Sequence, residues 1–299
     1  MKNNFHIITV DELFTPADSS GDIRGDINCI ELDSHGVSSQ FSSPIFLDAS
    51  IAILVLSGTA VFRVNYKTLP IKANTMILLS ASHLFYFKEC SFDFTCLCQF
   101  VSKKFMDDMD STDMIYRRIK YGVKMYNEPV MQLNNDNTAL LLERLTAVNR
   151  AIDNTGHLYY KEMILNTLFA FYLDLSNIID RRPEFYNEGN VTRYESIIKS
   201  FIELLVTNYR KEHKVDFYAS QLNISAHYLT FIVKRSTGQS VSDFIFEMLF
   251  SEARTLLSHS KLSIQEITTI LNFSDQSSFG KFFKRKAGLS PVDYRKNQK

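Results

Sequence analysis

The strongest constraint on the fold lies near the carboxyl end of the chain, where two short helical patterns flank a tight turn. Apolar residues recur at helical spacing before the turn and aromatic residues resume that spacing after it: Ile264, Ile267, Ile270, Leu271, Phe279, Phe282 and Phe283. Asn272 stands where the first helix must end, because Asn tolerates the left-handed backbone of a helix C-terminus. The outer face of the second helix is polar and cationic, which suits contacts with phosphates and base edges. The pattern therefore predicts a helix-turn-helix that can place a helix in a DNA groove.

A degenerate copy of this pattern lies about fifty residues upstream. Residues 222–225 (Leu-Asn-Ile-Ser) match residues 271–274 (Leu-Asn-Phe-Ser), and residues 234–238 match residues 284–288 after a one-residue offset in the turn. Residues 242–257 carry apolar side chains along one helical face, and a helix of that length can hold the two copies at a fixed separation. We therefore expect two recognition helices, at about residues 225–236 and 275–287.

This part of the chain resembles the DNA-binding domain of the AraC/XylS family of bacterial transcription regulators. The resemblance covers about residues 192–295. It rests on residues 253–254 and 256–257 of the predicted linker helix and on residues 273–279, 282–284, 288–291 and 294–295. Three positions depart from the family pattern. Thr268 replaces Ala, Asn272 replaces Gly, and Phe231 occupies a position often used for base contact.

The resemblance implies a sequence-specific transcription activator that binds double-stranded promoter DNA and acts with RNA polymerase. It also implies a small-molecule effector sensed by an amino-terminal domain. The distribution of charge agrees with DNA binding, although the formal net charge is zero. Residues 192–299 contain 16 Lys and Arg against 10 Asp and Glu, whereas residues 1–191 contain 17 against 23. The positive half is the half that contains both helix-turn-helix patterns.

The expected DNA contacts lie on the outer faces of the two predicted recognition helices, which can enter successive major grooves. The candidates for base contact are His227, Thr230, Gln276, Ser277, Ser278 and Lys281. The candidates for phosphate contact are Lys234, Arg235, Lys284 and Arg285. Cationic side chains at helix ends are often only solvated, so each assignment competes with that simpler interpretation.

Residues 21–100 show short apolar runs separated by turn residues, which indicates a β-sandwich or small barrel. This stretch resembles the cupin-like sensing domain of the same family more loosely, on pattern and on a turn histidine, His83. The candidate effector-pocket residues are Phe62, Arg63, Val64, Tyr66, His83 and Phe85. Strand alternation supplies two faces, and the sequence leaves open which face points inward.

Metal-dependent catalysis is not expected in this segment, because cupin metals are held by closely spaced histidines. Residues 21–100 contain only His35 and His83, so we expect no metal ligands, no catalytic residues and no cofactor. The four cysteines lack the spacing of zinc knuckles and are few for a disulfide scaffold. Cys96 and Cys98 alternate on a predicted strand, where they can be small buried residues or a redox pair.

After residue 111 the apolar spacing becomes helical, notably in residues 138–148 and 160–175. The wide stripes can pack within the chain or against a second copy in a homodimer. The expected fold class is α+β multidomain. We predict a cupin-like β-barrel or sandwich over residues 1–110, a helical dimerisation or packing segment over 111–180, and a linker over 181–192. An all-α domain with two helix-turn-helix units joined by a linker helix follows over 193–299. The amino terminus lacks a signal-peptide core and no apolar run approaches twenty residues, so a cytoplasmic protein without membrane contact is expected.

Three functional readings remain open at this stage. The first is a DNA-binding regulator controlled by a small molecule at the amino-terminal domain. The second is a regulator controlled by a protein partner or by dimerisation, which a tightly packed barrel would favour. The third is a cupin-type enzyme with a DNA-binding tail, which the missing ligand cluster disfavours.

Overall fold

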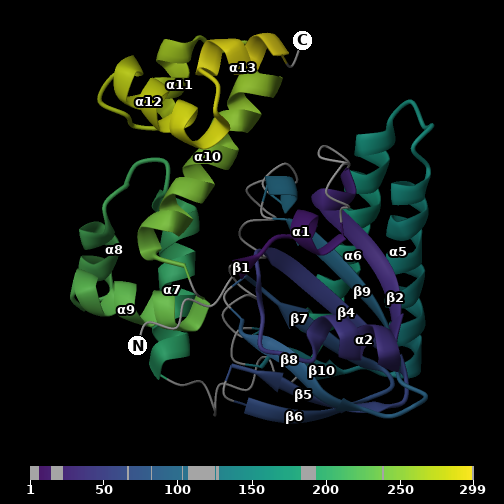
Figure 1. Ribbon diagram of the computed structural model, residues 1–299. Helices are drawn as coiled ribbons and strands as arrows, with labels where there is room; N and C mark the ends of the chain where they lie inside the picture. The colour runs from purple at the N-terminus through teal and green to yellow at the C-terminus, as the bar shows by residue number, and fades with distance from the viewer. Residues whose placement is uncertain are drawn as a thin grey trace. The chain divides into compact units, whose positions relative to one another are not determined.

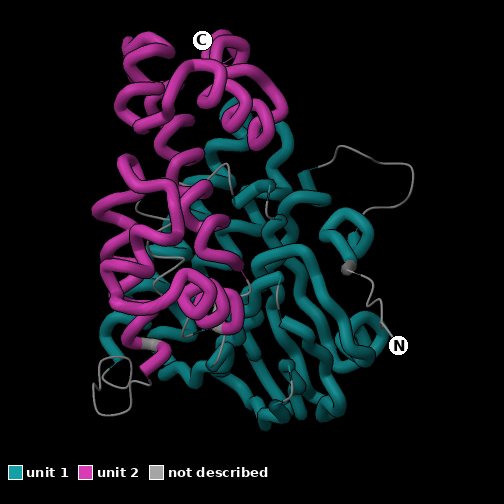
Figure 2. The backbone as a smooth tube through the Cα atoms, turned by 90° about the vertical axis from the view of Figure 1, so that its left-hand side faces the viewer, with its two compact units in different colours: residues 1–109, 124–189 teal, residues 110–123, 190–299 magenta. Residues whose placement is uncertain are grey.

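The computed structural model describes residues 7–14, 23–65, 67–81, 83–102, 104–106, 125, 128–182, 193–237 and 239–297. The described residues form two compact units (Figure 2). Those within residues 1–109 and 124–189 form the amino-terminal unit, and those from residue 193 onward form the carboxy-terminal unit. None of the described helices has both the length and the hydropathy of a membrane span.

The amino-terminal unit is built on a five-stranded antiparallel sheet with the order β10-β7-β4-β9-β2. Its strands are β2 (Ile27–Asp33), β4 (Ala49–Ser57), β7 (Thr75–Leu79), β9 (Thr95–Ser102) and β10 (Val130–Gln132). A three-stranded sheet has the order β6-β5-β8 and contains β5 (Thr59–Val64), β6 (Lys67–Lys72) and β8 (Phe85–Cys90). The short strands β1 (Ile7–Ile8) and β3 (Phe46–Leu47) form a parallel pair. Two sheets followed by helices confirm the expected α+β fold class.

The chain passes from the large sheet to the small one at Gly58, which has φ 72°. A Cβ at this position would lie 2.6 Å from the Cα of Phe94, so both the backbone conformation and the close approach require glycine. The inner faces of the sheets share one apolar core, to which alternate residues of each strand contribute. Aromatic rings fill much of it, and their centroids lie 4.8–6.2 Å apart in a connected set: Phe14, Phe41, Phe62, Phe85, Phe87, Phe94 and Phe100.

Helix α5 (Asn135–Asp153) lies beside β2 and β9, and helix α6 (Tyr160–Asp180) packs against α5 (Figure 1). The thiol of Cys29 on β2 donates to the carbonyl of Leu145 on α5 at 3.6 Å. The Arg144 guanidinium of α5 pairs with the Asp174 carboxylate of α6 at 2.7 Å. These contacts join the helix pair to the sheet and to each other. The shorter helices of this unit are α1 (Val10–Phe14), η1 (Ile23–Gly25) and α2 (Ser34–Phe41).

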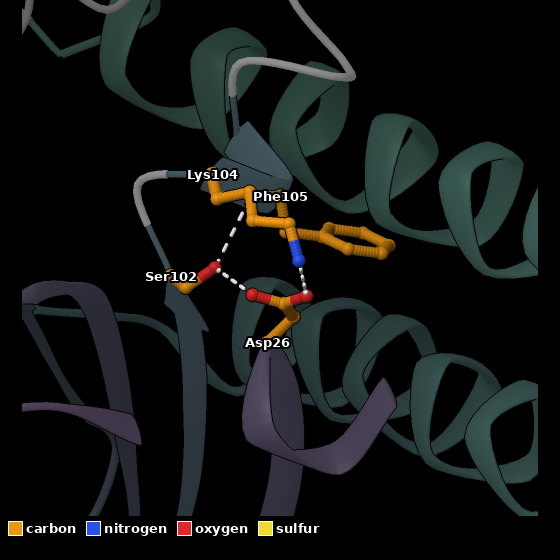
Figure 3. A network of polar contacts seen from close by, with 4 residues as sticks. All are labelled: Asp26, Ser102, Lys104 and Phe105. Carbon is orange, nitrogen blue, oxygen red and sulfur yellow. Dashed lines mark hydrogen bonds and ion pairs between the residues drawn. The ribbon is translucent and has the colours of Figure 1, made fainter. Parts of the chain in front are cut away.

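A small polar network fixes the chain where β9 ends (Figure 3). The Asp26 carboxylate accepts a hydrogen bond from the Ser102 hydroxyl at 2.8 Å and pairs with the Lys104 ammonium at 2.8 Å. The Ser102 hydroxyl in turn accepts from the backbone N–H of Phe105 at 3.1 Å. Phe105 is consequently held in a buried position immediately after the sheet.

The carboxy-terminal unit is all helical and has one continuous apolar core. Its helices are α7 (Arg193–Asn208), α8 (Val215–Gln221), α9 (Ala226–Thr237), α10 (Val241–His259), α11 (Ile264–Ile270), α12 (Gln276–Ala287) and α13 (Pro291–Asn297). Helix α10 begins with a capping box between Ser240 and Asp243 and runs between the two helix-turn-helix elements (Figure 1). The Arg295 guanidinium of α13 donates to the carbonyls of Leu257 and Leu262 at 3.1 and 2.6 Å, which satisfies one acceptor in the last turn of α10 and one in the segment that follows it.

The structure differs from the sequence-based expectations at several elements. Strand β10 lies within residues 111–180, which were expected to be helical, and α2 interrupts the expected run of strands. Helices α7 and α13 were not predicted. Most of the predicted linker, from residue 183 to 192, lies outside the described residues.

Candidate nucleic-acid interface

The turn of the second helix-turn-helix is closed by backbone hydrogen bonds that end α11. The N–H of Phe273 donates to the Thr268 carbonyl at 3.0 Å, and the N–H of Asn272 donates to the Thr269 carbonyl at 3.1 Å. Asn272 has φ 53°, so its predicted left-handed backbone is confirmed. This paired pattern is the Schellman motif, which satisfies carbonyls that a helix end leaves free.

The turn of the first helix-turn-helix repeats this geometry. The N–H of Ile224 donates to the Ala219 carbonyl at 3.0 Å, and the N–H of Asn223 donates to the Ser220 carbonyl at 3.1 Å. Asn223 has φ 54°. The two turns therefore share their hydrogen bonds and their left-handed residue, which supports the internal repeat read from the sequence.

The recognition helices α9 and α12 begin at side-chain caps. The Asp275 carboxylate accepts from the backbone N–H of Ser278 at 2.7 Å, and the Ser225 hydroxyl accepts from that of Tyr228 at 3.1 Å. Hydrogen bonds to the backbone of Ser278 and the hydroxyl of Ser274 lower the pKa of Asp275. The turn before α12 is one residue longer than the turn before α9, so the offset expected from the sequence is confirmed.

Helix α12 buries one face and exposes the other. Phe279, Phe282 and Phe283 are buried against the core, and the rings of Phe279 and Phe283 lie 6.0 Å apart. The exposed side chains are Gln276, Ser277, Lys281, Lys284, Arg285 and Lys286. Five of these were candidates from the sequence, and Lys286 adds a third cation to the last turn. The structure therefore brings a polar start and a basic end onto the accessible side of one helix.

Three candidates on α12 also make contacts within the protein. The Gln276 side-chain amide donates to the Gln265 side chain of α11. Ser278 is half-buried, and its hydroxyl is within hydrogen-bond distance of Asp275 and Ser274, at 3.2 and 3.1 Å. Its main contribution is to the cap that starts α12. The Arg285 guanidinium lies 5.9 Å from the ring centroid of Phe246 on α10, which orients it by a cation–π contact.

Helix α9 presents a more apolar face. His227, Lys234 and Arg235 are exposed and Thr230 is half-buried. Phe231 is 48% exposed, and the Arg235 guanidinium lies 5.9 Å from its ring centroid. An aromatic side chain therefore occupies the centre of this face, where α12 presents Lys281.

The candidate effector-pocket residues do not converge on one surface. Phe62, Val64 and Phe85 are at most 2% exposed and belong to the packed core between the sheets. Arg63 points to the opposite face of β5, where its guanidinium donates to the Tyr86 hydroxyl at 2.8 Å. His83 is buried in a turn and its Nδ1 accepts from the Ser80 N–H at 2.9 Å. Tyr66 lies outside the described residues.

The cysteines are free thiols without a reactive setting. Cys96 and Cys98 share the core-facing side of β9, as predicted, with their sulfur atoms 3.6 Å apart. A hydrogen bond with Cys96 and burial both raise the pKa of Cys98, and burial raises the pKa of Cys29 to about 12 and that of Cys90 to about 11. Within the described residues, the side chains of His, Cys, Asp and Glu form no group suited to a metal ion.

Comparison with known proteins agrees with this geometry. Residues 218–297 match the family model described as "Helix-turn-helix domain". The Msm operon regulatory protein of Streptococcus mutans is 24% identical over 258 residues, which cover 85% of this chain and 86% of that protein. The transcriptional activator RhaR of Escherichia coli is 25% identical over 143 residues. This match covers 48% of this chain and only 50% of RhaR.

The solved structures that match this chain do so with low TM-scores. An AraC-type regulator from Chromobacterium violaceum has a TM-score of 0.32 and 21% identity, and it matches 35% of this chain and 93% of its own. ToxT from Vibrio cholerae in its unsaturated fatty acid bound form has a TM-score of 0.33 and 16% identity, with 90% of this chain and 94% of ToxT covered. The sequence matches and the paired turns show that the carboxy-terminal unit is an AraC-type helix-turn-helix domain, and the chain is similar to DNA-binding transcription regulators of the AraC family.

Proposed function

We propose that each chain binds one promoter site by placing α9 and α12 in successive major grooves. The observation that carries this proposal is the paired geometry of the turns at Asn223 and Asn272, each followed by a capped helix with an accessible polar face. Helix α10 has 19 residues and is therefore about 28 Å long. This length is close to the spacing of about 34 Å between successive major grooves on one side of B-DNA.

Each of the two recognition helices supplies both base contacts and phosphate contacts. The proposed base contacts of α12 are Gln276, Ser277 and Lys281. Ser278 is a fourth proposed base contact, because it also lies in the first turn of the helix. His227 and Thr230 are the proposed base readers of α9. Lys234, Arg235, Lys284 and Arg285 are the proposed phosphate contacts, because cations in the last turn lie toward the DNA backbone when a helix enters the groove by its N-terminal end.

We also propose that the chain is an activator, that it acts with RNA polymerase, and that it responds to a small molecule at the amino-terminal unit. The relative RhaR is named as a transcriptional activator, which supports this direction of control. A specific observation favours a second candidate, in which a protein partner or dimerisation replaces the small molecule. Packed phenylalanine rings occupy the core between the sheets, including Phe62 and Phe85, which were expected to line a pocket.

Dimerisation through α6 forms part of both candidates. Met163, Phe169 and Leu173 on α6 are 41%, 38% and 38% exposed, and Tyr159 immediately before the helix is 65% exposed. Phe169 and Leu173 are four residues apart and lie on one face of the helix. Exposed apolar side chains clustered on one helix are typical of a contact with another chain.

The test is footprinting of the full chain on the DNA upstream of its own gene, over a series of salt concentrations and with unrelated competitor DNA. We expect a protected stretch of about two helical turns per chain that survives competitor and weakens as salt rises. Uniform protection that competitor removes would contradict sequence-specific reading. The same assay with candidate small molecules distinguishes the two modes of control.

A further inference from the structure

The loop between α7 and α8 contacts the turn of the second helix-turn-helix. The Asn272 side-chain amide donates to the Lys211 carbonyl at 2.7 Å. The His213 ring lies 5.1 Å, centroid to centroid, from the Phe273 ring. We call these contacts, between residues 211–213 and 271–273, the inter-repeat clasp.

Each side of the clasp is anchored to its own helix-turn-helix. On the first side, the buried Tyr218 of α8 donates its hydroxyl to the Glu212 carbonyl at 2.7 Å. On the second side, the Phe273 ring lies 5.4 Å from that of Phe279 and 5.0 Å from that of Phe282 on α12. A displacement of one side of the clasp is therefore transmitted to the helices that carry the recognition faces.

The same loop is also tied to the linker helix. The buried Glu252 carboxylate of α10 accepts from the Arg210 guanidinium at 2.7 Å and from the Tyr209 hydroxyl at 3.1 Å. A single connecting helix fixes the distance between two elements more firmly than their rotation about its axis. A second contact away from that axis closes a ring of contacts and restrains the rotation.

The side chain at position 272 has a function beyond its backbone conformation. Its φ of 53° would be adopted at lower cost by glycine, which has no Cβ. Asn223 occupies the equivalent place in the first turn with φ 54°, yet its side chain is exposed and makes no hydrogen bond with the described residues. The amide of Asn272 therefore distinguishes two turns that are otherwise alike.

We propose that the inter-repeat clasp fixes the relative orientation of α9 and α12 and so sets the spacing between the two half-sites that the chain accepts. This inference rests on the proposed function, in which both helices contact DNA together. Asn272 and His213 act as positioning residues. They set the geometry of the pair without touching bases.

The first test uses Asn272→Gly, which keeps the left-handed backbone and removes only the side-chain hydrogen bond. Asn223→Gly is the matched control in the other turn. The probes are a duplex selected from a random library by the full wild-type chain, the same duplex with one half scrambled, and duplexes with one base pair inserted or removed between the halves. Loss of a hydrogen bond predicts about three- to tenfold weaker binding of the native spacing by Asn272→Gly. We expect unchanged binding of the scrambled-half duplex and weaker discrimination between spacings.

Equal spacing dependence in the two variants would overturn the proposal. So would an equal loss on the scrambled-half duplex, because Asn272 would then act within one half-site. A second measurement does not depend on DNA. Spin labels attached at His227→Cys and Ser277→Cys report the distance between α9 and α12. Its distribution should broaden in Asn272→Gly and not in Asn223→Gly, and an unchanged distribution would refute the clasp even if the wild-type chain selects no two-part site.

Discussion

Phe231 lies in the centre of the accessible face of α9, where its ring gains little from burial. Aromatic side chains in a major groove can contact the methyl group of thymine. We expect Phe231 to read thymine in the half-site of the first helix-turn-helix. Replacement of that thymine by uracil removes one methyl group, which is worth about 0.8 kcal/mol, or roughly fourfold in affinity. Binding of thymine and uracil duplexes to the full chain measures this difference.

The control for this prediction is Phe231→Ala, which should bind both duplexes equally. Lys281→Ala retains Phe231 and should keep the preference for thymine in that half-site. If Phe231→Ala retained the preference, another residue of α9 would be the reader. A loss of all binding would instead indicate that the ring supports the fold of α9.

His213 makes the stability of the carboxy-terminal unit depend on pH. Burial lowers its pKa below the ordinary value of 6.5, although the carbonyls of Arg210 and Leu271 and the Glu212 carboxylate oppose the shift. Its Nε2 is buried without a hydrogen-bond partner. The unfolded chain therefore binds a proton at a higher pH than the folded chain does. The free energy of unfolding should fall as the pH drops below about 6.5.

Urea unfolding followed by circular dichroism at several pH values tests this dependence. His213→Gln removes the titrating group and should flatten the part of the curve that His213 contributes. Parallel curves for the two proteins would show that other groups cause the dependence.

At the scale of elements, α12 has one glycine inside the helix and another at its C-cap, and the two differ in backbone conformation but not in the space around them. A Cβ at Gly280 or Gly288 would have no neighbour within 4 Å. Gly280 lies inside the helix, whereas Gly288 caps it with φ 74°. We expect Gly280→Ala to raise the free energy of unfolding by about 0.5–1 kcal/mol, because glycine is a poor helix former. Gly288→Ala should lower the free energy by a similar amount or more, because alanine is strained at positive φ.

Denaturant unfolding of both variants measures this difference within one helix. Changes of the same sign would contradict the backbone argument. DNA binding of Gly280→Ala is an additional readout, because this position lies between Ser277 and Lys281. Weaker binding of the more stable variant would show that the helix backbone approaches the bases closely.

The sequence predicts elements best where a strong local pattern coincides with a turn signal. The turn residues Ser57 and Gly58 mark the boundary between β4 and β5, and the apolar spacing after Asp275 located α12 within one residue. Helices α7 and α13 were not predicted from the sequence, although α7 is amphipathic. Strand β10 has only three residues and obtains its hydrogen bonds from β7, so no local periodicity could reveal it.

The recognition faces were easier to predict than the amino-terminal site. Along α12, a period of 3.6 residues separates Phe279 and Phe283 from Lys281 and Lys284, so the exposed face follows from spacing alone. On β5, alternation distinguished Arg63 from Phe62 and Val64 without indicating which side faced the core. The inter-repeat clasp could not be predicted from the sequence for a different reason. Lys211 and Asn272 are distant in sequence and meet only in the tertiary structure.

At the scale of the whole molecule, the exposed apolar face of α6 predicts a homodimer that charge should disrupt. We expect the double variant Phe169→Glu, Leu173→Glu to dimerise at least about tenfold more weakly, because two carboxylates would have to leave water. Analytical ultracentrifugation of the full chain measures this. Phe92→Glu is the control, because Phe92 is 99% exposed in the turn before β9. A wild-type chain that remains monomeric, or equal effects of both changes, would contradict a dimer through α6.

The two turns described above also separate the residues that build the scaffold from those that we propose to contact DNA. Their closing hydrogen bonds run between backbone groups, and the anchoring rings of α12 point inward. Residues on the outer faces can therefore be substituted without unfolding the protein. If α9 and α12 each contact one half-site, the operator can change one half-site at a time. The exposed residues of one helix can change while the other helix still binds its original half-site. Exchange of the exposed residues of α9 and α12 is accordingly a route to engineered specificity.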